Sequence, residues 1–233
     1  MHIKYKKDSP DQIEKRKLLN SLYFPSLLVV MLWTIFLMEV LNDINFTDFG
    51  IYPLKISGLK GILFAPLIHG SIKHLFNNSV PLLVLGTTIF YFYRIVAFRL
   101  IILSWIITGI WVWFMARPAY HIGASGLIYS WASFIFFSGI IRKNTNLMAI
   151  SLLITFLYGS MVWGIFPYKE AVSWESHLMG GLSGLILAVF YRKYGPEKQL
   201  PEWMYEDEDE ENDDDEKETN NSHLTIEYDS EKE

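Results

Sequence analysis

The sequence predicts an all-α polytopic membrane protein with six transmembrane helices and a disordered acidic C-terminal tail. Three observations predict this fold class: six long apolar runs, an uneven placement of basic residues between them, and a sharp change of charge near Pro196. The net charge of −5 describes neither part of the chain. Residues 1–196 carry 17 basic and 8 acidic side chains, whereas residues 197–233 carry 17 acidic and three basic ones.

The six apolar runs have about the length that a bilayer requires. Twenty helical residues span about 30 Å, which is the thickness of the hydrocarbon core. The fourth and fifth runs contain no charged residue, whereas helices buried in soluble domains usually present a charged face to water. We therefore predict membrane spans instead of a soluble helical bundle. The runs cover residues 22–41, 74–98, 100–116, 123–141, 147–166 and 175–191.

The basic residues predict the orientation of these spans. If the N-terminus lies inside, the inner segments hold thirteen of the eighteen Lys and Arg residues up to Lys198, and the outer segments hold five. Cytoplasmic loops of membrane proteins are enriched in Lys and Arg. Both termini are therefore expected in the cytoplasm.

The expected organisation has three parts. Residues 1–20 form a cytoplasmic N-terminal segment, residues 21–195 form the six-helix membrane domain, and residues 196–233 form the acidic cytoplasmic tail. The tail includes EDEDEEN and DDDEKE, where like charges repel and no core can be buried, so it should be disordered. The connector 42–73 is too hydrophobic for disorder and should fold on or into the outer leaflet.

The residues available for chemistry narrow the possible activities. The chain has no cysteine, which excludes a thiolate zinc site, an iron–sulfur cluster and a cysteine nucleophile. His69 and His74 are five residues apart, about 140° around a helix, so they do not share a face. No Asp lies inside any run, so a membrane aspartyl dyad is excluded. We predict no metal site and no cofactor; His69 is expected to order the connector, and His121 receives no role.

What remains is a serine with a histidine. Ser125 begins the fourth run between Gly123 and Gly126, which permit a tight turn and the close approach of a substrate carbonyl. A serine hydroxyl needs a neighbouring base, and imidazole suits that task. By itself, Gly-x-Ser-Gly is a weak signal, and ordinary packing of small residues is the alternative.

The sixth run supplies the histidine. Gly180 and Gly184 form a stripe of small residues that allows two helices to approach closely, and His177 lies on the same face. A close contact between the fourth and sixth spans would bring Ser125 and His177 within hydrogen-bonding reach. A buried, hydrogen-bonded histidine without a catalytic task is the alternative.

Three more residues are candidates for supporting roles. Tyr129 follows the serine by one helical turn, where its ring can stack on the histidine, although a core aromatic is equally consistent. His74 and Asn78 share a face of the second span and can both donate hydrogen bonds, either to an oxyanion or as polar caps of the helix. Asn77 points about 100° away, so we select Asn78.

In this order along the chain, the motifs resemble those of the rhomboid family of intramembrane serine proteases, over roughly residues 20–195. The motifs are His69…His74-x-x-x-Asn78, Gly123-Ala-Ser-Gly126, Tyr129, and His177-x-x-Gly180-x-x-x-Gly184. The resemblance implies a dyad of Ser125 and His177 without an acidic third member. It also implies an oxyanion site formed by the Ser125 N–H, His74 and Asn78.

The connector resembles the family only in part. Gly50-Ile-Tyr-Pro53 looks like the connector of bacterial members. Many members also carry a Trp-Arg pair there, and none occurs between Asn42 and Lys73.

The resemblance implies an endopeptidase of the bacterial plasma (inner) membrane. Its partners would be the lipid bilayer and single-pass transmembrane proteins, cleaved near the outer face, and no nucleic acid. An alternative is a catalytically inactive rhomboid-like protein that binds or escorts membrane clients. A transporter would need charged or broken-helix sites at mid-membrane, which the centres of the runs lack.

Overall fold

The computed structural model describes residues 9–157, 164–167 and 173–196, and it is helical throughout these ranges apart from the connecting turns and one isolated bridge. A helix lies in each of the six expected segments. These helices are α1 (Pro10–Asn42), α3 (Ile72–Phe92), α4 (Ala97–Met115), α5 (Ser125–Arg142), α6 (Thr145–Leu157) and α8 (Trp174–Phe190). The expected tail lies outside the described residues, and the division into three parts stays a prediction.

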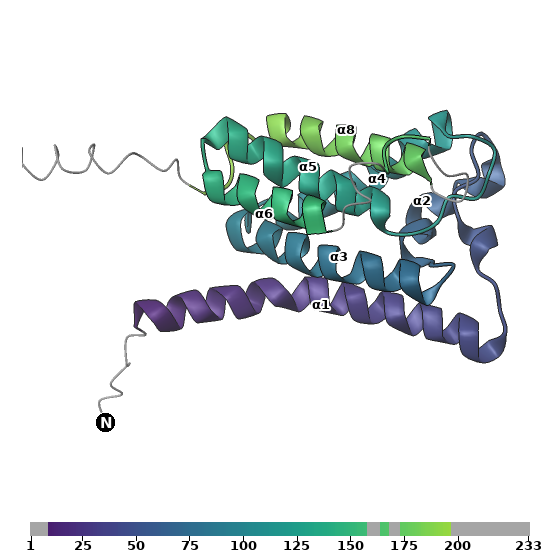
Figure 1. The fold of residues 1–233 in the computed structure, drawn as a ribbon, viewed down its shortest axis with the longest axis horizontal. Coiled ribbons are helices and arrows are strands. Elements are labelled where there is room, and N and C mark those ends of the chain that lie inside the picture. The colour runs from purple at the N-terminus through teal and green to yellow at the C-terminus, as the bar shows by residue number, and fades with distance from the viewer. Residues whose placement is uncertain (1–8, 158–163, 168–172, 197–233) are drawn as a thin grey trace, which may run out of the picture. The chain divides into compact units, whose positions relative to one another are not determined.

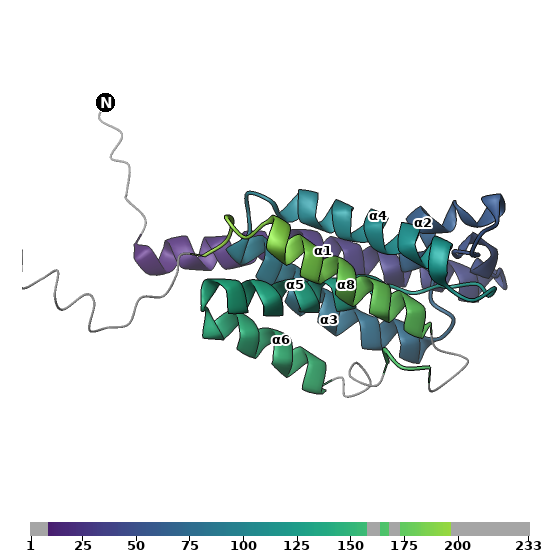
Figure 2. The same cartoon turned by 90° about the horizontal axis from the view of Figure 1, so that it is seen from above.

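The helices lie side by side, with α5 near the centre (Figure 1). Helix α1 packs along α3, and α8 packs along α5 over much of its length. Seen from above, α6 and α4 lie on opposite sides of the α5–α8 pair (Figure 2). The side chains between the helices form a core that includes Leu82, Leu85, Trp131 and Phe134, all fully buried.

The outward surface of this bundle is apolar. Among the residues that the structure describes, three helices, α1, α3 and α4, are long and hydrophobic enough to cross a membrane. Large apolar side chains on them remain exposed, such as Val30, Leu41 and Ile102. Apolar surfaces of this extent are unfavourable in water, and on helices of this length they fit a lipid bilayer. The chain is therefore an integral membrane protein.

The largest differences from the predicted helix boundaries are at the start of α1 and the end of α3. Helix α1 begins twelve residues before the expected start of the first span, because Ser9 and Gln12 form a reciprocal capping box around its first turn, which starts at Pro10. The expected second span, 74–98, is wrong at its end, because α3 stops at Phe92. A short turn holds Arg94 before α4 begins at Ala97, so this charge does not lie within a helix.

The connector between α1 and α3 folds into four short helical turns. They are η1 (Thr47–Phe49), η2 (Ile56–Gly58), α2 (Gly61–Phe64) and η3 (Ala65–Leu67). Two indoles of α4 fasten this segment: Trp105 Nε1 donates to the Ile62 carbonyl and Trp113 Nε1 donates to the Lys55 carbonyl, each at 2.9 Å. Tryptophans of α4 thus hold the connector, which lacks a Trp-Arg pair of its own. Its insertion into the outer leaflet stays a prediction.

Candidate active site

Ser125 and His177 meet at the end of α5 that adjoins the connector. Ser125 is the first residue of α5 and His177 lies in the first turn of α8. The Nε2 atom of His177 is 2.8 Å from the Oγ atom of Ser125. Ser125 is partly buried and His177 is 8% exposed, so the pair is largely screened from solvent.

The partner of the other ring nitrogen shows which nitrogen of the neutral His177 ring carries the proton. His177 Nδ1 lies 2.8 Å from the main-chain carbonyl oxygen of Gly164. A carbonyl only accepts hydrogen bonds, so Nδ1 must hold the proton of the neutral ring. Nε2 then presents a lone pair to the Ser125 hydroxyl. The imidazole is therefore in the tautomer that a general base requires.

The ring of Tyr129 fixes the plane of the histidine. Its centroid lies 4.2 Å from that of the His177 ring, and the two planes differ by 7°. Tyr129 is one helical turn beyond Ser125 on α5. The imidazole is thus held by a stacked ring on its face and by hydrogen bonds at both nitrogens.

Two glycines of α8 make the contact between α5 and α8 possible. A Cβ atom on Gly180 would lie 2.1 Å from the Gly126 carbonyl oxygen, and one on Gly184 would lie 2.1 Å from the Ser130 carbonyl oxygen. Both distances are far below van der Waals contact. The main chains of the two helices therefore touch, which is the close packing that small residues permit.

The residues expected around an oxyanion lie over Gly123. This glycine has φ +102°, a left-handed conformation that favours glycine. A Cβ at this position would be 2.7 Å from His74 Nε2 and 3.6 Å from Asn78 Nδ2. Both side chains therefore lie beside Gly123, two residues before Ser125. Ser125 is the first residue of α5, so its own N–H has no acceptor within the helix.

His69 orders this side of the site. Its Nε2 is 2.9 Å from Asn78 Nδ2, and its ring meets that of His74 edge to face at 4.9 Å. Burial, assisted by the nearby His74, lowers the pKa of His69 to about 3, so the ring is neutral near pH 7. Asn77, by contrast, is exposed. The amide that faces the site is therefore Asn78.

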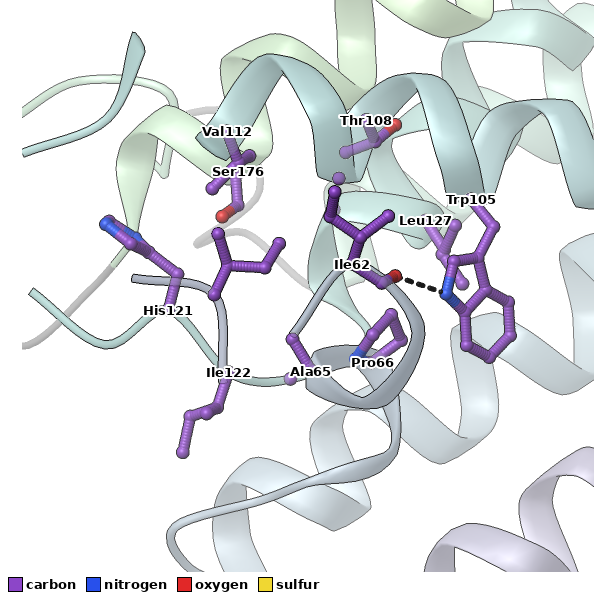
Figure 3. Close-up of a pocket in the computed structure, with 14 residues that line it drawn as sticks. Ile62, Ala65, Pro66, Trp105, Thr108, Val112, His121, Ile122, Leu127 and Ser176 are labelled. Atoms are coloured by element: carbon purple, nitrogen blue, oxygen red, sulfur yellow. Dashed lines mark hydrogen bonds between the residues drawn. The ribbon is translucent and has the colours of Figure 1, made fainter. Parts of the chain in front are cut away.

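A small cavity of about 30 Å³ lies beside Gly123 and Gly126. Figure 3 shows His121 and Ser176 along one side of it and Trp105 on the other. His121, which the sequence left without a role, is buried and bonded to two neighbours. Sequence reasoning also missed the Gly164 carbonyl. No cluster of three or more potential metal ligands occurs within the described ranges.

The part of the chain that carries the candidate site matches a known protein family. The Rhomboid domain family matches residues 57–194. A protein of Mycobacterium bovis is 37% identical over 183 residues, which cover 73% of this chain and 74% of that one. A protein of Mycobacterium tuberculosis gives the same values. A protein of Mycobacterium leprae is 32% identical over 187 residues, 73% of this chain and 70% of its own length.

The three relatives are each described only as uncharacterized, so they assign no substrate. The domain match includes the motifs from His69 to Gly184, while Gly50-Ile-Tyr-Pro53 lies ahead of it. It covers more than half of the chain. The chain is a member of the rhomboid family.

Proposed function

We propose that the protein is an intramembrane serine endopeptidase in which Ser125 is the nucleophile and His177 the general base. The observation that carries the proposal is the 2.8 Å contact between His177 Nε2 and Ser125 Oγ, with Nδ1 bound to a carbonyl. Together these contacts supply a hydroxyl and a base of the correct tautomer within hydrogen-bonding distance. A protein that only binds or escorts membrane clients would not require this arrangement.

The reaction follows the order expected of a serine hydrolase. Ser125 Oγ attacks the carbonyl carbon of the scissile bond while His177 Nε2 takes the hydroxyl proton. The resulting imidazolium keeps its Nδ1–H bond to Gly164 and gives the Nε2 proton to the leaving amine. Water, deprotonated by the same nitrogen, then hydrolyses the acyl-enzyme and restores the Ser125 hydroxyl.

Negative charge on the tetrahedral intermediate would be stabilised at the start of α5. The Ser125 N–H, the imidazole of His74 and the amide of Asn78 are the proposed donors. The main support is the approach of both side chains to Gly123, two residues before the nucleophile. Donors already held in place lower the barrier because they need no reorganisation during the reaction.

The proposed substrates are single-pass transmembrane proteins cleaved near the outer face of a bacterial plasma membrane. Six spans with both termini in the cytoplasm would place the start of α5, and with it Ser125, on the outer side. The distribution of basic residues supports this orientation.

The test is cleavage of a fluorogenic transmembrane substrate by the full chain reconstituted in liposomes. Ser125→Ala and His177→Ala should each lower kcat by at least about 1,000-fold, because the two groups act as a unit. Ser138→Ala is the matched control: it removes a buried, bonded serine hydroxyl from the same helix and should leave kcat unchanged. Undiminished cleavage by Ser125→Ala would exclude the proposal.

A further inference from the structure

A second group of polar side chains lies beside the proposed dyad. His121 is 3% exposed; its Nδ1 is 2.6 Å from Ser173 Oγ and its Nε2 is 3.0 Å from the Arg117 carbonyl oxygen. Ser173 Oγ is in turn 2.6 Å from Ser176 Oγ. None of these groups takes part in the proton transfers proposed above. Buried polar groups are costly unless they are bonded, so a complete chain of bonds specifies one arrangement.

The donor and the acceptor of each hydrogen bond in this group can be assigned. The Arg117 carbonyl only accepts, so His121 Nε2 carries the proton of the neutral ring. His121 Nδ1 therefore accepts from the Ser173 hydroxyl, whose oxygen can then accept from Ser176. Burial, the largest influence, lowers the pKa of His121 and favours this neutral form. The cluster joins the loop before α5 to the start of α8.

His121 and Ser173 occupy equivalent positions in the sequence relative to the two residues of the dyad. His121 lies four residues before Ser125, and Ser173 lies four residues before His177. The 2.6 Å contact between His121 and Ser173 thus spans the same two segments as the 2.8 Å contact of the dyad. The loop at His121 is also held by a two-residue antiparallel bridge to Ile51 in the connector.

A salt bridge makes a second link between the same segments. Glu175 is 3% exposed, and its Oε1 lies 3.4 Å from a guanidinium nitrogen of Arg117 and 3.4 Å from the Arg117 main-chain nitrogen. Glu175 is two residues before His177. Two independent contacts therefore connect the segments that carry the nucleophile and the base.

We propose that His121 and Ser173 form a positioning pair that holds Ser125 and His177 at reacting distance. This role rests on the proposed dyad. Loss of the pair leaves both reacting groups in the protein but lets the loop and the start of α8 move relative to one another. Small displacements of reacting atoms reduce the rate of the chemical step more than the binding of substrate.

The experiment compares the full chain with His121→Ala, Ser173→Ala and the control Ser138→Ala in liposomes. Each is assayed for kcat and KM, and for the rate at which a fluorophosphonate labels Ser125. His121→Ala and Ser173→Ala should lower kcat and the labelling rate about ten- to a hundredfold, with KM unchanged within about twofold. Ser138→Ala should match wild type in all three measurements.

A conservative variant separates positioning from simple loss of stability. His121→Asn places a carbonyl oxygen near the former Nδ1 atom, so it can still accept from Ser173, and it should recover part of the lost kcat. His121→Ala and Ser173→Ala combined should be no worse than the more severe single variant, because both remove the same bond. If His121→Ala does not fold, Ser173→Ala and its combination with His121→Asn still test the role.

The outcomes distinguish this inference from the proposed function. If wild type is labelled and His121→Ala and Ser173→Ala are labelled equally fast, the positioning role is wrong and the dyad stands. Equal losses of kcat and of folded protein in all three alanine variants, the control included, would also overturn the positioning role. If wild type is neither labelled nor active while Ser125 is intact, the proposed function fails and the positioning role fails with it.

Discussion

The two ends of α5 are built from similar groups but differ in chemistry. At its start, Ser125 pairs with the imidazole of His177, while near its end the hydroxyl of Tyr93 donates to Ser138 at 2.7 Å. About 20 Å of helix separates the two serines. Only the first serine faces a nitrogen lone pair that can take its proton.

The other end of α5 uses its polar groups to fasten the chain. Arg142 donates to the carbonyl oxygens of Arg192, Tyr194 and Pro196, and so holds the segment that follows α8. Guanidinium and carbonyl groups cannot exchange a proton at neutral pH. A buried serine hydroxyl is thus a candidate nucleophile only when its hydrogen-bond partner can accept its proton. Burial and hydrogen bonding alone are not sufficient.

Apart from removal of Ser125 or His177 itself, widening the contact between α5 and α8 should have the largest effect on the catalytic end. Gly180→Ala would place a Cβ atom 2.1 Å from the Gly126 carbonyl oxygen, and the helices must move apart. We expect kcat to fall about 100-fold and the free energy of unfolding to fall by about 1–3 kcal/mol. Cleavage assays and thermal unfolding in detergent measure the two effects.

The matched control for this prediction is the neighbouring glycine. A Cβ on Gly181 would meet nothing within 4 Å. Gly181→Ala should therefore keep wild-type activity and stability. Equal behaviour of the two variants would mean that the close packing is unimportant.

Removing the stacked ring should have a smaller effect on the same end. Tyr129→Ala would leave one face of His177 unsupported, while Tyr129→Phe keeps the ring that lies 4.2 Å away. A stacked pair is worth about 0.5–1.5 kcal/mol, so kcat of the alanine variant should fall about two- to twelvefold. The phenylalanine variant should stay close to wild type in the same assay; a matching loss would assign the effect to the hydroxyl instead.

Changes at the other end of α5 should alter stability without altering catalysis. Arg142→Ala removes donors to three carbonyl oxygens and should lower the free energy of unfolding by about 1–3 kcal/mol. The kcat of folded protein should not change. A drop in kcat that exceeds the loss of folded protein would show that the two ends are coupled.

The smallest expected effect is a pH-dependent loss of stability at His69. Its pKa is lowered from 6.5 to about 3 in the folded protein, so only the unfolded chain takes up a proton there as the pH falls below 6.5. Between pH 7.5 and 5.5 this costs about 1 kcal/mol of stability. His69→Gln keeps an acceptor for Asn78 and should lose less stability over that range. Thermal unfolding of both proteins at pH 7.5 and 5.5 measures this difference. An equal loss of stability in wild type and His69→Gln would contradict the role given to His69.

The helices of this protein were predictable from sequence because long apolar runs with few charges favour membrane-spanning helices. Ser9 and Gln12 could also have extended the first helix, since a capping box can be read from the sequence. The end of α3 could not be placed as well, because the apolar run continues past Phe92 and Arg94 alone marks the turn.

The candidate site divides along similar lines. Ser125 could be selected from several serines because it lies between two glycines at the start of an apolar run, and His177 because few ionisable side chains lie in the runs. His121 could not, because its partner Ser173 is 52 residues away and neither lies in a recognisable motif. The carbonyl of Gly164 was also unpredictable, since every residue type carries the same atom. Side-chain patterns cannot reveal a contact made by the main chain.

The Gly164 contact has a consequence for mutational scans. A carboxylate that oriented the imidazole would reveal itself when replaced, whereas an alanine at position 164 presents the same oxygen to His177. Saturation mutagenesis would thus detect Ser125 and His177 but not the carbonyl of residue 164. Replacing the peptide bond after residue 164 with an ester, which weakens the carbonyl as an acceptor, would expose it.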